Sequence, residues 1–185
     1  MAEHVCPWWL GYVLASPLRR VWQNPRAILS PCVREGMTVL EPGPGMGFFT
    51  LDLARLVGRQ GRVIALDVQE KMLRSLERRA KKAGLEGTIT LRLPRGASMD
   101  VADLAGQVDL VLAFAVVHEL PDAALFFREA GAALKPNGKV LLAEPTGHVD
   151  AGAWARTLEL ARAAGLKEDA SLTIRRSHAA LLSKA

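Results

Sequence analysis

Residues 39–47 read VLEPGPGMG, and this stretch decides how the rest of the chain is interpreted. Branched apolar residues end a predicted strand, Glu41 stands at its tip, and the glycines at positions 43, 45 and 47 alternate into a predicted helix start. Glycine has no Cβ and accepts positive φ, so a ligand can lie directly against such a turn. The helix that follows offers free N–H groups and the positive end of its dipole. The stretch therefore predicts a nucleotide-type ligand site at the carboxyl end of a parallel strand.

The spacing of the glycines narrows the choice of ligand. A dinucleotide fingerprint requires glycine at its first, third and sixth positions, and counting from Gly43 the sixth position is Phe48. This disfavours a nicotinamide dehydrogenase. A Walker loop would end in Gly-Lys-Ser/Thr, which this stretch lacks. The pattern is E-x-G-x-G-x-G, and a buried acid at Glu41 would repel a pyrophosphate but would suit an ammonium group.

This pattern resembles motif I of the class I S-adenosylmethionine (SAM)-dependent methyltransferases. Their ligand carries an amino acid and a sulfonium. Further segments resemble the family's motifs in the same order: RVIALDVQEKML at 62–73, VDLVLAF at 108–114, VHELPD at 117–122 and LKPNGKVLL at 134–142. The resemblance covers about residues 36–150 and is carried by four motifs in order, so it identifies the chain as similar to this family.

The resemblance implies SAM as cofactor and assigns the glycine turn to its amino acid end. Gly43, Gly45 and Gly47 would line the methionine moiety, and Glu41 would act on the amino group directly or through water. Methyl transfer from a sulfonium is a direct in-line displacement, so no metal site is expected.

Other residues are expected to bind the rest of the cofactor. Asp67, with Val68 beside it, would accept hydrogen bonds from both ribose hydroxyls. Phe114, at the mouth of the fourth strand, would lie near the transferring methyl group. After the third strand the family usually offers an acid to the adenine amino group, but Arg95 stands near that position. We therefore expect the adenine to be held by backbone or by Ser98.

His118 is the candidate catalytic residue. It lies in the VHELPD segment, where family members often place groups that face the substrate. A histidine there could take the proton from a hydroxyl or thiol nucleophile. The alternative is that His118 braces the loop before Pro121. Glu144 and His148 follow the fifth strand and are expected at the same rim as secondary candidates.

The alternation of apolar runs with helical stretches predicts an α/β fold with a parallel sheet and crossover helices. The resemblance implies a doubly wound, seven-stranded, mostly parallel Rossmann-like sheet with one reversed strand in a C-terminal hairpin, the last strand running from about 179 to 182. Strands are predicted near 37–41, 62–67, 88–93, 108–113 and 139–144, and helices near 47–57, 69–83, 122–134 and 151–164.

Individual residues are expected to mark where these elements begin and end. Gly58, Gly84 and Gly165 stand where helix C-terminal caps belong, and Asp150 is a plausible N-cap for the last long helix. Residues 137–138 (Asn-Gly) supply a turn that leads into the fifth strand.

The length of 185 residues predicts a single domain. Within residues 1–185 we expect an N-terminal cap (1–35), a cofactor-binding core (36–150) and a C-terminal helix and hairpin (151–185). The cap concentrates aromatic residues, and Trp8, Trp9 and Tyr12 are the candidates for contact with the substrate.

Composition limits the partners. The two cysteines are far apart in sequence, which favours a reducing, cytoplasmic setting, and no apolar run reaches transmembrane length. A net charge of +5 permits an anionic partner, and basic residues share one face of the helix after Asp67: Arg74, Arg78, Lys81 and Lys82. A solvated outer face is the preferred interpretation of that cluster over a nucleic-acid patch.

The preferred function is SAM-dependent methyl transfer to a small-molecule acceptor. The alternatives are an RNA or protein methyltransferase and a SAM-binding module without catalysis. The N-P-P-Y sequence of amino-group methyltransferases is absent after the fourth strand, where residues 115–118 read AVVH. Neither the acceptor atom nor the oligomeric state follows from the sequence.

Overall fold

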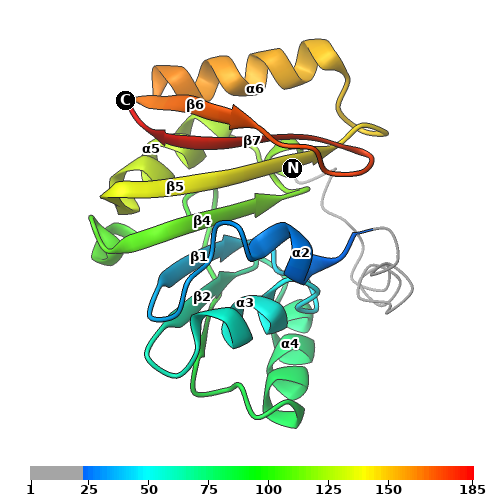
Figure 1. The fold of residues 1–185 in the computed structure, drawn as a ribbon, viewed down its shortest axis with the longest axis vertical. Helices are drawn as coiled ribbons and strands as arrows, with labels where there is room; N and C mark the ends of the chain where they lie inside the picture. Colours follow the sequence, from blue (N-terminus) through cyan, green and yellow to red (C-terminus); the bar gives the residue numbers. More distant parts are fainter. Residues whose placement is uncertain (1–22) are drawn as a thin grey trace. The chain divides into compact units, whose positions relative to one another are not determined.

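The computed structural model describes residues 23–185, so the predicted substrate residues Trp8, Trp9 and Tyr12 lie outside the described residues. The chain divides into two compact units, residues 1–94 and 95–185, each with its own set of strands (Figure 1).

The first unit carries three parallel strands in the order β3-β2-β1. Helix α3 packs against β1 and β2, and α4 packs against β3. The centres of β1 and β2 are apolar and buried, as expected for strands covered on both faces, whereas no residue of β3 is fully buried. Its elements are α2 (Pro25–Leu29), β1 (Thr38–Pro42), α3 (Thr50–Val57), β2 (Arg62–Leu66), α4 (Glu70–Lys82) and β3 (Ile89–Arg92).

The helix predicted at 47–57 begins later than expected, at Thr50. Gly47 has φ +84°, which is outside the right-handed helical region, so the glycine turn must end before the helix can begin. At the other end the prediction is confirmed: Gly58, with φ +67°, is the C-cap, and its N–H donates to the carbonyl of Ala54 at 3.2 Å.

The second unit has four strands in the order β4-β5-β7-β6. Strands β4 and β5 are parallel, and β7 runs antiparallel to both β5 and β6, so β7 is the reversed strand (Figure 1). Its elements are η2 (Ala102–Leu104), β4 (Val108–Phe114), η3 (Val117–Glu119), α5 (Ala123–Ala133), β5 (Leu134–Pro145), α6 (Ala151–Ala163), β6 (Leu166–Ser171) and β7 (Ser177–Lys184). The expected C-terminal hairpin with one reversed strand is therefore confirmed.

The start of the fifth strand was predicted wrongly. Pairing with β4 already begins at Leu134, which lies opposite Val108, and resumes with Lys139 opposite Leu110. The residues between them, 135–138, form a bulge inside β5 instead of a turn before it. A Cβ at Gly138 would lie 2.8 Å from the Val108 carbonyl oxygen, so the bulge requires glycine at this position.

The predicted caps of the other helices are confirmed. Asp150 is the N-cap of α6, and its Oδ1 accepts a hydrogen bond from the N–H of Ala153 at 2.7 Å. Gly84 and Gly165 adopt φ values of +66° and +80° directly after the C-caps of α4 and α6. No helix among residues 23–185 combines the length and apolar character needed to cross a membrane.

Candidate functional site

The glycine turn between β1 and α3 is held by hydrogen bonds to the last residue of β2 and to the side chain of the residue that follows it. Gly43, Gly45 and Gly47 adopt φ values of +68°, +54° and +84°. The N–H of Gly43 donates to the Leu66 carbonyl at 2.8 Å, and the N–H of Gly45 donates to Oδ2 of Asp67 at 3.2 Å. The turn and the acid at the end of β2, which are 22 residues apart in the sequence, therefore form one structure.

Helix α4 contacts the same turn through two side chains that sequence reasoning did not assign to the site. A Cβ at Gly47 would lie 2.4 Å from Cδ1 of Leu76, so this glycine allows close packing of α4. Arg79 donates through Nη1 to the carbonyl oxygen of Met46. The available signal was spacing: Met72, Leu76 and Arg79 follow i, i+4, i+7, which places Arg79 on the buried stripe of the helix.

Glu41 is a buried acid, as the sequence predicts. Its side chain is 3% exposed, and among the described residues its Oε2 has no hydrogen-bond partner. Burial raises the pKa of Glu41 from 4.5 to about 8. Thr50 lowers this pKa through a polar contact that falls short of hydrogen-bond geometry, and the charge of Asp67 raises it. Glu41 is thus mostly protonated at neutral pH in the ligand-free protein, and a cationic partner beside it would favour its ionised form.

Asp67 lies at the end of β2, where the sequence predicts the ribose-binding acid. Its two oxygens each accept one backbone N–H, Oδ1 from Gln69 at 2.8 Å and Oδ2 from Gly45 at 3.2 Å. These two bonds fix the orientation of the carboxylate beside the glycine turn. Beside it, Val68 is 54% exposed, which leaves a large apolar side chain open to a ligand.

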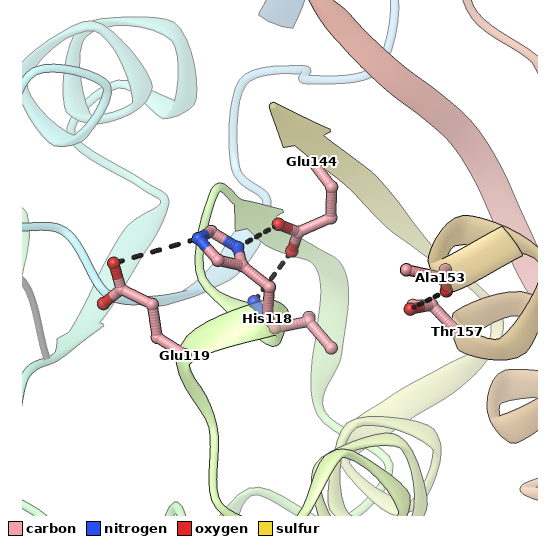
Figure 2. Close-up of polar contacts among 6 residues, drawn as sticks. His118, Glu119, Glu144, Ala153 and Thr157 are labelled. Carbon is pink, nitrogen blue, oxygen red and sulfur yellow. Dashed lines mark hydrogen bonds and ion pairs between the residues drawn. The ribbon is translucent and has the colours of Figure 1, made fainter. Parts of the chain in front are cut away.

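In the second unit, a buried carboxyl group holds the predicted catalytic histidine (Figure 2). Glu144, at the end of β5, is 1% exposed; its Oε1 accepts the N–H of Val117 at 2.8 Å, and its Oε2 is bonded to Nδ1 of His118. The side chain of His118 is 19% exposed. On its other side, Nε2 of His118 lies 3.9 Å from Oε1 of Glu119.

The surroundings of His118 favour its charged form. The hydrogen bond with Glu144 raises the pKa of His118 most, burial opposes it, and the negative charges of Glu144 and Glu119 raise it further. The ring of His148 meets the His118 ring edge-on, with centroids 5.5 Å apart. Because Glu144 accepts the proton of Nδ1, the neutral imidazole presents an unprotonated Nε2, which is the form a general base needs.

The backbone is strained where β4 ends. Ala115 has φ +55°, a left-handed conformation that is unusual for a residue with a Cβ, and its N–H donates to the Ala143 carbonyl at 2.7 Å. Strain of this kind is concentrated at functional sites. Phe114, the residue before it, is 9% exposed, so most of its ring is packed in the protein.

Ser98 has a structural partner in the second unit. Its Oγ donates to Oε1 of Glu129 at 2.5 Å and accepts the N–H of Asp100 at 2.9 Å. The N–H of Met99 donates to the other oxygen of Glu129 at 2.8 Å. Glu129 therefore anchors the segment after β3 to α5, a role that no sequence motif indicated. The expected adenine contact of Ser98 stays a prediction. Among the described residues, no group of His, Cys, Asp and Glu side chains is arranged to hold a metal ion.

Comparison with known proteins places the chain in a family. The family described as methyltransferase domain matches residues 33–173. The chain belongs to this family. Its relatives include nocamycin O-methyltransferase of Saccharothrix syringae, 33% identical over 66% of this chain and 42% of that protein. Demethylmenaquinone methyltransferase of Staphylococcus carnosus is 27% identical over 73% of this chain and 54% of that protein. The chain thus spans about half the length of these relatives.

Solved structures confirm the predicted fold. A SAM-dependent methyltransferase from Aquifex aeolicus superposes with a TM-score of 0.84 at 22% identity, covering 96% of this chain and 98% of that one. A SAM-dependent O-methyltransferase from Thermotoga maritima gives a TM-score of 0.68 at 19% identity, covering 88% and 64%. At these identities the likeness shows the fold alone: the α/β, seven-stranded, mostly parallel Rossmann-like sheet expected from the motifs.

Proposed function

We propose that this chain is a SAM-dependent methyltransferase that transfers the sulfonium methyl group to a nucleophile on a small molecule. The observation that carries the proposal is the buried carboxyl group of Glu41, whose Oε2 has no hydrogen-bond partner among the described residues. A buried polar atom without a partner costs free energy unless a ligand satisfies it. The ammonium group of an amino acid moiety has the charge and donors to do so.

The residues of the turn fit the remainder of such a cofactor. Gly43, Gly45 and Gly47 expose backbone to the methionine moiety, and the oriented carboxylate of Asp67 accepts the ribose hydroxyls. Bound SAM supplies an electrophilic methyl group. The task of the protein is then to hold the acceptor in line with that group, and positioning of this kind can contribute roughly 7–11 kcal/mol.

His118 is proposed to remove the proton of the acceptor. Glu144 holds Nδ1 of its ring, which leaves Nε2 for a hydroxyl or thiol. This arrangement supports catalysis over a module that only binds SAM. Glu119 and His148 flank the ring and would face the same acceptor.

A small-molecule acceptor is favoured by the relatives. The names of two of them specify nocamycin and demethylmenaquinone, both small molecules. An RNA acceptor would be supported by the exposed basic face of α4. On that face, however, the charge of Arg74 is already paired with Glu70 at 2.8 Å. We further propose that residues 1–185 act as a single domain in which Trp8, Trp9 and Tyr12 contact the acceptor.

Calorimetric titration with S-adenosylhomocysteine tests the proposal, with NADH as the control ligand. We expect micromolar binding of S-adenosylhomocysteine and no heat from NADH. Asp67→Asn should weaken the binding, whereas Glu77→Gln, on the exposed face of α4, should not. Binding of NADH, or no binding of S-adenosylhomocysteine, would overturn the assignment of the cofactor.

A further inference from the structure

Helix α4 presents an arginine where its pattern calls for an apolar residue. Met72, Leu76 and Ala80 are buried, and Arg79 lies on the same side of the helix, three residues after Leu76. The other basic residues of the helix, Arg78 among them, are exposed. A charged side chain on a buried stripe is unfavourable unless it has a specific partner.

Arg79 is hydrogen-bonded to the glycine turn. Its Nη1 donates to the carbonyl oxygen of Met46, which is 33 residues away in the sequence. Met46 stands between Gly45, whose N–H is bonded to Asp67, and Gly47, against which Leu76 packs. The hydrogen bond therefore attaches α4 to the turn at Met46. This residue lies between Gly45, which is bonded to Asp67, and Gly47, which packs against α4.

This bond restrains a segment with unusual conformational freedom. Three glycines in five residues would give the turn many conformations in the absence of a ligand, because glycine loses more backbone entropy on ordering than any other residue. A guanidinium bond to the middle carbonyl removes much of this freedom before the ligand arrives. A preorganised site binds more tightly because less ordering remains to be done on binding.

We propose that Arg79 is a positioning residue for the cofactor: it holds the turn at 43–47 in the conformation that accepts the amino acid end of S-adenosylmethionine. The inference rests on the proposed function. It predicts a larger effect on ligands that carry the amino acid end, because the hydrogen bond from Arg79 to Met46 acts on the turn that would hold this end.

The test compares two ligands and three variants. S-adenosylhomocysteine carries the amino acid end, and 5′-methylthioadenosine lacks it. Arg79→Met keeps the aliphatic part of the side chain and removes the donor, Arg79→Lys restores the charge and one donor group, and Arg78→Met is the matched control on the exposed face of the same helix. Calorimetry measures both affinities, and thermal unfolding of the ligand-free protein shows whether the fold is retained.

Loss of a hydrogen bond from a charged donor should weaken the binding of S-adenosylhomocysteine by about tenfold or more in Arg79→Met. The affinity for 5′-methylthioadenosine should stay within about twofold, Arg79→Lys should be intermediate, and Arg78→Met should match the wild type. Equal losses of affinity for both ligands would show that Arg79 has a merely structural role and would overturn the proposal. An affinity of Arg79→Met for S-adenosylhomocysteine equal to that of Arg78→Met would overturn it as well. If the wild type binds neither ligand, the proposed function itself fails, and the role of Arg79 with it.

Discussion

Glu41→Gln should stabilise the ligand-free protein at neutral pH while weakening its binding of the cofactor. Burial raises the pKa of Glu41 from 4.5 to about 8. Between these two values the folded chain binds a proton that the unfolded chain has released, so the free energy of unfolding falls as the pH rises. At about 1.4 kcal/mol per pH unit, the loss reaches about 3 kcal/mol by pH 7. Glutamine is nearly isosteric and cannot ionise, so the variant should not lose this stability.

Urea unfolding at a series of pH values from 4.5 to 8 measures this difference. The wild type and Glu41→Gln should have similar stabilities near pH 4.5 and should diverge to about 3 kcal/mol by pH 7, with the variant more stable. Glu77→Gln, at an exposed position on α4, should follow the wild type throughout. Parallel curves for the wild type and Glu41→Gln would refute the reasoning, since they would show that Glu41 is ionised in the folded protein at neutral pH.

The proton held by Glu41 should be released when the cofactor binds. An ammonium group near Glu41 favours the carboxylate, so binding of S-adenosylhomocysteine at pH 7 should release close to one proton in the wild type. Calorimetry in buffers of different ionisation enthalpy counts this proton. Glu41→Gln should release none from this site and should bind more weakly. Stabilisation combined with weaker binding is the pattern expected where a buried group is retained for function.

Three further perturbations follow from the structure. The hydrogen bond with Glu144 raises the pKa of His118, so kcat on a phenol, quinol or thiol acceptor should rise with pH, with a midpoint above pH 6.5. In Glu144→Gln the rising limb of this pH profile should move to lower pH, and the plateau value of kcat should fall by at least about tenfold. The exposed Glu159→Gln should change neither the limb nor the plateau. An unmoved limb would exclude Glu144 as the orienting group. Ala115→Gly should raise the free energy of unfolding, measured in urea, by about 0.5–1 kcal/mol. Glycine removes a left-handed strain of about 1–2 kcal/mol, and its greater backbone entropy in the unfolded chain offsets part of that gain. A loss of stability would show that Ala115 is unstrained. Gly138→Ala should lower the free energy of unfolding by about 1–3 kcal/mol, because the new Cβ would lie 2.8 Å from a carbonyl oxygen of β4; an unchanged urea midpoint would mean that the bulge can relax.

The sequence by itself predicted most of the strands and helices and the glycine turn, and it proposed the residues that would bind the cofactor. Apolar runs that end in Glu41 and Asp67 mark two strands, and the alternating glycines mark the turn after the first. These features could be predicted because strand burial, glycine conformations and helix caps depend on residues that are near neighbours in the chain. Gly58 and Asp150 occupy the predicted cap positions for the same reason.

Only the tertiary structure decided which side chains meet across the chain. Glu144 reaches His118 over 26 residues, Glu129 reaches Ser98 over 31, and Arg79 reaches the turn over 33. The contact of Glu144, on β5, depends on strand register, because a shift of one residue along a strand turns a side chain to the opposite face. The contacts of Glu129 and Arg79 depend on how the helices α5 and α4 pack. The bulge in β5 is one such register effect, and it moved the start of the strand to Leu134. Local pattern thus sets which residues line the end of each strand, and packing between distant segments sets which of them act together.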